Sequence, residues 1–220
     1  MINIQRRQWL VGLSSMAAAG FIGPAAALLP TPKQTAGPFY PTQLPLDDDN
    51  NLTEVKGKNG IAKGIISDLR GRIVDINGRA LAGLRIEIWQ CDANGRYRHP
   101  REQGSKKIDD KFQGHGATRT DASGEYRFRT IRPVSYPGRT PHIHIAVRVP
   151  SARPFVTQLY VAGEAGNERD FLYQQIPPEK RNRVTAEFNV AATSAFASGA
   201  ELQAEFDIIL HRRDGTPLQD

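Results

Sequence analysis

Cysteine is almost missing from this sequence of 220 residues, which contains only Cys91. A single thiol cannot form a disulfide within the chain, so no covalent cross-link is expected to stabilise the fold. Cys91 comes just after the apolar stretch Ile86–Trp89. We therefore expect a small buried core residue at this position rather than a reactive thiol.

Blocks of basic residues and internal repeats are also lacking. The formal net charge is +6, but the lysines and arginines are scattered and do not alternate with aromatic residues. A nucleic-acid-binding surface normally needs such clustering, so nucleic acid is not expected as a partner. The length suits one substantial hydrophobic core, and hence one domain.

No hydrophobic run is long enough to cross a membrane. The best candidate begins after Arg6 and Arg7 and reads WLVGLSSMAAAGFIG, with glycines throughout, before the small residues 24–27. It is too short for a stable membrane anchor. The twin arginine and the small residues resemble a twin-arginine export signal with its cleavage site. We therefore expect residues 1–30 to be a signal and the protein to be periplasmic or secreted. Such export carries folded proteins, often with a cofactor already bound.

Residues 31–60 form a second segment, which is rich in proline and then polar. No helical or strand period is present, so an extended N-terminal arm is expected, with Phe39 and Tyr40 as its anchors on the body. The acidic run at 47–51 lacks the glycine and distal glutamate of a calcium loop. We interpret it as a solvated loop.

From residue 61 the pattern changes to short strands separated by turn residues. The candidate strands are LRGRIVDI, LRIEIWQC, EYRFRTI, HIHIAVRV, TQLYVAG and LQAEFDIIL. Asn77-Gly78 is a strong hairpin signal, and apolar residues alternate with polar ones as in half-buried antiparallel strands. The prediction for 61–220 is an all-β fold, an antiparallel β-sandwich with long loops, with a short helix within 178–188.

The stretch SYPGRTPHIHIAV at 135–147 carries the most informative chemistry. In a strand, Ile143, Ile145 and Val147 make one apolar face, while His142 and His144 project together from the other. Two imidazoles one pleat apart suit a single metal ion. The turn at 136–138 can return a phenol toward the start of this strand.

The rest of a metal site is not evident from these residues alone. No carboxylate lies close in sequence to complete a set of two histidines and one carboxylate. Tyr97, in GRYRHP, is a candidate, but a loop aromatic explains it more simply. His99, His115 and His211 are interpreted as surface or hydrogen-bonding residues, Arg148 as part of an ion pair, and Tyr126 and Phe128 as core.

Four separated motifs agree with one family. GRYRHP, DASGEYRFRTIRP, SYPGRTPHIH and TQLY resemble the intradiol ring-cleaving dioxygenases, the family of protocatechuate 3,4-dioxygenase and catechol 1,2-dioxygenase. The resemblance covers most of 33–162, and QTAGPFYP at 34–41 is similar to the N-terminal arm of the protocatechuate branch. The step of 39 residues from Tyr97 to Tyr136 also fits that branch.

The resemblance implies a mononuclear non-haem Fe(III) site with the ligands Tyr97, Tyr136, His142 and His144. Of these, Tyr136 and His142 would be axial. The catalytic residues implied are Tyr136, Arg139 as the active-site arginine, and Gln158 behind the ligands. The activity implied is insertion of O2 between the two hydroxylated carbons of a catechol, giving a cis,cis-muconate-type diacid. Relatives assemble from like or unlike chains.

The sequence departs from the family pattern at one place, and a second family resemblance offers an alternative function. The segment between Tyr136 and His142 is shorter than in the best-known members, which leaves the identity of the catechol open. GRIVDINGRALAGLRIEIW and TDASGEYRF also resemble transthyretin-like and carboxypeptidase-regulatory modules, which are not catalytic. That second resemblance ends near residue 131 and explains neither Tyr97 nor SYPGRTPHIH. The enzyme is therefore the favoured prediction.

Overall fold

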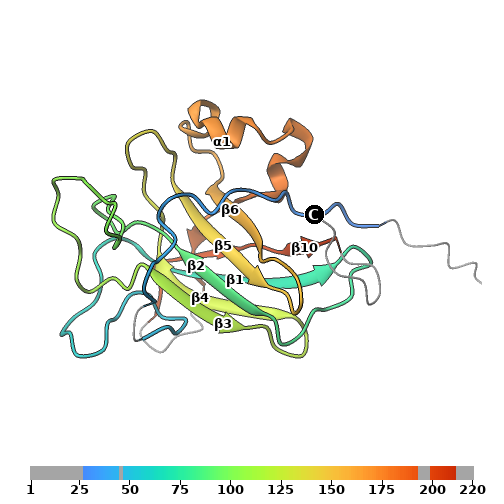
Figure 1. Ribbon diagram of the computed structural model, residues 1–220, viewed down its shortest axis with the longest axis horizontal. Coiled ribbons are helices and arrows are strands. Elements are labelled where there is room, and N and C mark those ends of the chain that lie inside the picture. The colour runs from blue at the N-terminus through green and yellow to red at the C-terminus, as the bar shows by residue number, and fades with distance from the viewer. Residues whose placement is uncertain (1–26, 45–46, 193–198, 212–220) are drawn as a thin grey trace, which may run out of the picture.

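The computed structural model describes residues 27–44, 47–192 and 199–211, and it shows two sheets packed face to face (Figure 1). The expected export signal lies almost wholly outside these residues. One sheet has the order β3-β2-β5-β6-β7. The other has the order β10-β1-β9-β8, with β4 on the free edge of β1. The predicted all-β sandwich is confirmed.

The strands of the first sheet are β2 (Arg85–Trp89), β3 (His115–Arg119), β5 (His142–Arg148), β6 (Phe155–Val161) and β7 (Thr185–Ala186). Those of the second are β1 (Ile66–Asp75), β4 (Glu125–Ile131), β8 (Asn189–Val190), β9 (Leu202–Glu205) and β10 (Ile208–Leu210). A 3-10 turn η1 (Asn167–Arg169), the short helix α1 (Phe171–Gln174) and a second 3-10 helix η2 (Pro178–Arg183) follow β6.

Both sheets are mixed, because β1 pairs in parallel with β9 and β10 and β6 pairs in parallel with β7. β9 lies along residues 67–70 of β1, and β10 along residues 73–75. Between them, the Phe206 carbonyl passes so close to Gly71 that a Cβ there would lie 1.9 Å from its oxygen. Only glycine fits at this crossing.

The core lies between the sheets and confirms the predicted direction of the strand side chains. Ile143, Ile145 and Val147 of β5 are fully buried in it, together with Leu69 and Phe128 from the opposite sheet. Burial of this apolar surface is the main favourable contribution to folding, at about 25 cal/mol per Å². The histidines of β5 therefore project from the outer face of their sheet.

The arm crosses that outer face, as the blue segment in Figure 1 shows. The Gln34 N–H donates to the Val156 carbonyl (2.8 Å), and its side-chain amide donates to Thr157 and to the Gln158 carbonyl (both 3.1 Å). Phe39 and Tyr40 pack on the face further along. The first part of the expected arm therefore lies on the sheet, with Phe39 and Tyr40 packed on its face.

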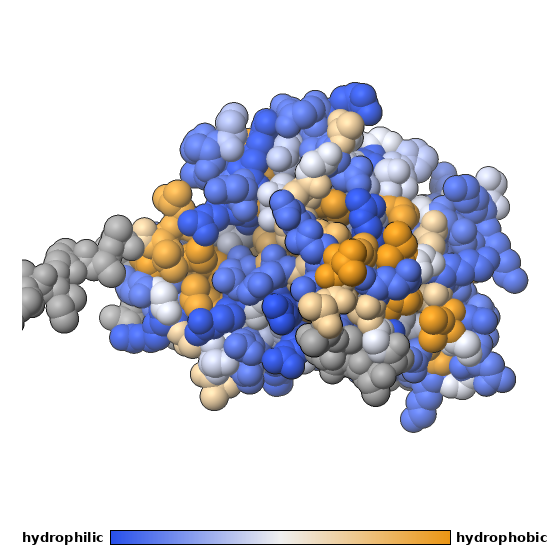
Figure 2. All heavy atoms as spheres, turned by 180° about the vertical axis from the view of Figure 1, so that it is seen from behind, coloured by the Kyte–Doolittle hydropathy of each residue, from blue (hydrophilic) through white to orange (hydrophobic). Residues whose placement is uncertain are grey.

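The rest of the surface is mostly hydrophilic on the side shown in Figure 2, where apolar side chains gather in separate areas. Within the part of the chain that the structure describes, no helix is long and apolar enough to cross a membrane.

Candidate metal and catalytic site

The two histidines of β5 face each other at the centre of the outer sheet face. His142 Nε2 and His144 Nε2 are 3.2 Å apart, and both side chains are almost fully buried. His142 Nδ1 lies 2.7 Å from the Thr140 carbonyl oxygen, which can only accept, so Nδ1 donates. The Nε2 atom of His142 therefore carries a lone pair directed at the space beside His144. This is the arrangement of a metal-ligating histidine held by a backbone carbonyl.

The neighbouring strands supply the walls through their register. Trp89 of β2 is directly opposite His144, and its indole stacks on the imidazole with centroids 4.9 Å apart and an interplanar angle of 5°. On the other side, Gln158 of β6 is opposite His144, and Tyr160 is opposite His142. The alternation of β6 therefore places both side chains on the face that carries the histidines.

Tyr97 reaches this face from the loop after β2. The Asp92 carboxylate accepts the N–H groups of Asn94 (2.8 Å) and Arg96 (3.0 Å), which closes the turn before it. The Tyr97 side chain is only 2% exposed, and its hydroxyl has no hydrogen-bond partner among the described residues. A buried phenol without a partner is unusual and requires an explanation.

Tyr136 comes from the turn before β5. The Arg139 N–H donates to the Tyr136 carbonyl (2.9 Å), and Gly138 takes the left-handed φ of +82° that this turn needs. The predicted tight turn at 136–138 is therefore confirmed. It leaves the Tyr136 ring partly exposed at the edge of the sheet face.

The rings of these four residues converge. The Tyr136 ring lies 5.5 Å from those of Tyr97 and His142, and the Tyr97 ring lies 6.3 Å from that of His144. Phe39 of the arm stacks on Tyr97 at 4.6 Å and so covers the cluster from the solvent side. The structure thus brings together residues separated by up to 47 positions in the chain.

Burial sets the protonation states in the protein alone. It lowers the pKa of His142 to about 4 and that of His144 well below its usual range, so both imidazoles are neutral near pH 7. Burial also raises the pKa of Tyr97 and of Tyr136, although the nearby Arg139 charge opposes this at Tyr136. Neutral imidazoles are ready ligands, and a bound cation would favour the phenolates.

These residues fit a metal ion. Two imidazole nitrogens and two phenol oxygens provide four donors, and an ion among them explains the unpartnered Tyr97 hydroxyl. Among the described residues, no group of three or more His, Cys, Asp or Glu side chains is placed to hold a metal. A donor set rich in phenolate suits a hard cation.

Arg139 lies beside this cluster and is held by two partners. Its Nε donates to Asp170 Oδ2 (2.7 Å), and its Nη2 donates to Gln158 Oε1 (2.7 Å). Gln158 in turn donates from Nε2 to the Thr35 carbonyl of the arm (3.0 Å). The two residues predicted to act behind and beside the ligands are thus in direct contact.

Sequence reasoning missed three residues of this site: Trp89 and Tyr160 on the sheet face, and Asp170 in the turn before α1. Period-2 alternation could have placed Trp89 and Tyr160, since each shares a face with a named neighbour on its strand. Asp170 had no comparable signal, because it joins Arg139 across 31 residues.

The remaining residues singled out in the sequence are structural. Arg148 pairs with Glu87 (3.1 Å), which confirms the predicted ion pair, and Tyr126 and Phe128 are buried in the core. His115 is buried 3.3 Å from Asp48, and His211 is exposed. None of these lies among the four converging rings.

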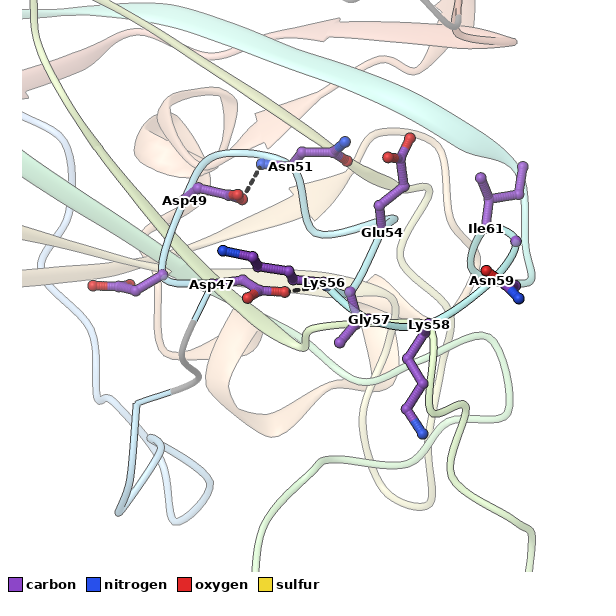
Figure 3. A pocket seen from close by; sticks show the side chains of 12 residues that line it. Asp47, Asp49, Asn51, Glu54, Lys56, Gly57, Lys58, Asn59 and Ile61 are labelled. Carbon is purple, nitrogen blue, oxygen red and sulfur yellow. Dashed lines mark hydrogen bonds between the residues drawn. The ribbon is translucent and has the colours of Figure 1, made fainter.

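A hollow of about 930 Å³ lies away from the four converging rings, within the loop 47–61 (Figure 3). Two of its acidic side chains are engaged by the loop itself, and a third, Asp48, pairs with Arg85 of β2. The Asp49 carboxylate accepts the Asn51 N–H (2.9 Å), and that of Asp47 accepts the Lys56 N–H. The hollow is therefore formed by the folding of a polar loop, which agrees with the solvated loop predicted at 47–51.

Comparison with known proteins extends the resemblance to dioxygenases over most of the chain. A family model described as Dioxygenase matches residues 35–212. The protocatechuate 3,4-dioxygenase beta chain of Burkholderia cepacia is 34% identical over 90% of this chain and 87% of its own length. The hydroxyquinol 1,2-dioxygenase of Corynebacterium glutamicum is 31% identical, but the chain spans only 45% of its length.

Solved structures of dioxygenases are also similar to this chain. The dioxygenase domain of a carbohydrate-binding fusion from Streptomyces sp. SirexAA-E is 27% identical with a TM-score of 0.62, over 84% of this chain and 99% of that one. Catechol 1,2-dioxygenase from Acinetobacter sp. ADP1 is 26% identical with a TM-score of 0.62, over 86% of this chain and 66% of that one. The matches continue past residue 131, where the resemblance to non-catalytic modules ends. The chain therefore belongs to the intradiol ring-cleaving dioxygenases.

Proposed function

We propose that this enzyme uses a mononuclear non-haem ferric ion, held by Tyr97, Tyr136, His142 and His144, to open a catechol between its two hydroxylated carbons. The observation that carries the proposal is the convergence of two neutral imidazoles and two phenols around one space, with the Tyr97 hydroxyl buried and unpartnered among the described residues. When bound there, Fe(III) supplies Lewis acidity that makes the catechol ring reactive toward O2.

The chain's own residues provide protons, charge and exclusion of water. Tyr136 is the more exposed phenol, and its Oη as phenolate is a base that can take the proton of a catechol hydroxyl. Arg139 supplies a fixed positive charge in a nearly dry setting, which stabilises negative charge that develops on the ring. Phe39 and Trp89 exclude water from the two ligands on which they stack.

For the substrate we propose a protocatechuate-like catechol with an anionic substituent. The first support is the similarity to a protocatechuate 3,4-dioxygenase beta chain along most of both sequences. The second is the net positive charge of the chain. Catechol and hydroxyquinol are the competing substrates, since relatives bearing those names also match.

We further propose export through the twin-arginine route and assembly with like or unlike chains. The residues Arg6 and Arg7 support the first, and the similarity to a protein named as a beta chain supports the second. Replacing both arginines with lysine should retain the protein in the cytoplasm in a fractionation experiment. Native mass spectrometry of the purified protein should show more than one chain.

The decisive test is the colour of the iron-loaded protein. Ferric tyrosinate absorbs visible light, so one iron per chain should give a wine-red solution. Tyr136→Phe should shift or weaken this band, while Tyr126→Phe should preserve it, because Tyr126 donates to the Phe206 carbonyl in the core (2.5 Å). A colourless protein that holds iron would overturn the proposed site. Oxygen uptake with protocatechuate, catechol and hydroxyquinol would then rank the substrates.

A further inference from the structure

We propose that Asp170 is a positioning residue: its carboxylate fixes the Arg139 guanidinium against the metal site and ties it to the start of helix α1. The proposal rests on the proposed function, in which Arg139 stabilises developing charge. Neither the sequence motifs nor the family match points to Asp170.

Both carboxylate oxygens of Asp170 accept two hydrogen bonds each. Its side chain is 0% exposed. Oδ2 accepts the Arg139 Nε–H (2.7 Å) and the Thr140 N–H (2.9 Å). Oδ1 accepts the N–H groups of Leu172 and Tyr173 (both 3.0 Å). Four donors fill the acceptor positions of one carboxylate, so this group has a single allowed orientation.

Half of this arrangement is an ordinary helix cap. Asp170 is the N-cap of α1, a helix of four residues, and Oδ1 alone satisfies its free N–H groups. A serine would cap the same turn almost as well. The second oxygen is not needed by the helix, and it is the one that faces Arg139. The second oxygen is therefore explained by Arg139 and the Thr140 N–H rather than by the cap, and Arg139 is the only charged group of the two.

The other partners of Arg139 cannot replace Asp170. The Arg139 side chain is only 8% exposed, while Gln158 Oε1 (2.7 Å) and the Tyr160 hydroxyl (3.5 Å) are neutral. A buried guanidinium without a charged partner is costly and tends to turn toward water. Phe171, whose ring centroid lies 5.6 Å from the guanidinium, is also uncharged, and it is 60% exposed. Asp170 prevents the turn toward water.

The first experiment separates positioning from capping. Asp170→Ser keeps a hydroxyl for the helix N–H groups but removes the oxygen that binds Arg139. We expect kcat to fall about 10- to 100-fold, as for a displaced catalytic group. Iron content and the Kd for 4-nitrocatechol should stay close to those of the wild type, while the melting temperature falls, because the Arg139 guanidinium and the buried Thr140 N–H lose their acceptor. Asp75→Asn, a buried turn-capping aspartate in the other sheet, is the matched control.

A double-mutant cycle with Arg139→Gln gives the sharper result. If Asp170 acts through Arg139, Asp170→Ser should cost less than about 3-fold in the Arg139→Gln background, since coupled residues are not additive. Equal losses in both backgrounds, or a parallel loss of iron and of 4-nitrocatechol binding, would overturn the proposal. If the serine variant does not fold, Asp170→Asn takes its place, because the amide can still accept one pair of N–H groups.

A measurement without turnover keeps this test separate from the proposed function. In protein loaded with diamagnetic Ga(III) in place of iron, the Arg139 Nε–H signal in ¹⁵N NMR should be protected from exchange in the wild type and in Asp75→Asn, and lost in Asp170→Ser. Its persistence in Asp170→Ser would contradict the proposal even if the enzyme opened no ring. A chain with the protected signal but no activity toward any catechol would count against the proposed function alone.

Discussion

Glu87 and Arg148 lie on the same sheet face as the two histidines, and their charges are balanced in a small network. The Glu87 carboxylate accepts from Arg85 (2.9 Å), from Arg148 (3.1 Å) and from the Tyr40 hydroxyl (3.0 Å). Burial tends to raise the pKa of Glu87, but these donors outweigh it, and the net pKa lies below the usual value. The carboxylate is therefore charged in the folded protein and joins the arm to the sheet.

Glu87→Gln should lower the free energy of unfolding at pH 7 by about 1 to 3 kcal/mol, the range for a hydrogen bond to a charged group. Because the folded pKa is depressed, this contribution is complete above the unfolded value of about 4.3 and is lost as the pH falls through the lower folded pKa. Urea unfolding from pH 7 to pH 3 should show the difference shrinking below about pH 4.

Glu205→Gln is the control for this prediction. Glu205 also pairs with an arginine, Arg70, but at 3.7 Å with both side chains more than half exposed. Such pairs contribute about 0 to 1 kcal/mol. A pH-independent loss for Glu87→Gln, or a loss no larger than that of the control, would show that the network does not stabilise the fold.

The residues of the proposed site differ in how far the sequence alone could place them. Strand alternation places His142 and His144 side by side from the letters alone. Tyr97 required the family resemblance, because its position depends on how a loop of ten or more residues returns to the sheet. Asp170 was not predictable by either route, since an ion pair between two loops leaves no period in the sequence.

The arm is the element that completes the site. Gly37 takes a φ of +68°, and a Cβ there would lie 3.3 Å from His144 Cε1. The backbone of the arm therefore passes directly over a proposed metal ligand. Hydrogen bonds from Gln34 and to Thr35 hold this passage against β6.

Gly37→Ala should weaken iron binding as well as stability. The left-handed φ costs an alanine about 1 to 2 kcal/mol, and the added methyl group presses on the His144 imidazole. Gly57→Ala is the matched control, since Gly57 has a φ of +80° with nothing within 4 Å. Iron per chain and visible absorption should fall in the first variant and not in the second. Equal iron retention would mean that the arm does not support His144.

At the level of elements, the strands with clear alternation were predicted and the others were not. β3 has the sequence HGATR, without an apolar period, and exists because it pairs along β2. LQAEFDIIL was predicted as one strand, but Phe206 and Asp207 divide it into β9 and β10. The expected helix within 178–188 is a 3-10 helix, Pro178–Arg183, which gives way to β7. In each case tertiary pairing decided what local pattern could not.

For the molecule as a whole, Cys91 is a probe of global opening. Its thiol is 1% exposed and lies 3.6 Å from the Val134 carbonyl, and burial raises its pKa to about 12. Almost no thiolate is present at pH 8, so a disulfide reagent should react only with opened molecules.

Labelling of Cys91 should therefore be slow in buffer and rise with urea in parallel with unfolding measured by circular dichroism. One thiol per chain should react in concentrated urea, which serves as the control. Fast labelling in buffer would show that the region between Trp89 and Tyr97 opens locally, apart from the rest of the fold.

The pairing of β1 with β9 and β10 also sets an order of events during synthesis. β1 ends at Asp75, while its parallel partners begin at Leu202, so the ribosome makes them more than a hundred residues later. Until then one edge of β1 and the Gly71 crossing have no partner, and the second sheet cannot close. The nascent chain therefore cannot complete its fold until translation is nearly finished. The proposed export route, which carries folded proteins, would then act only after synthesis.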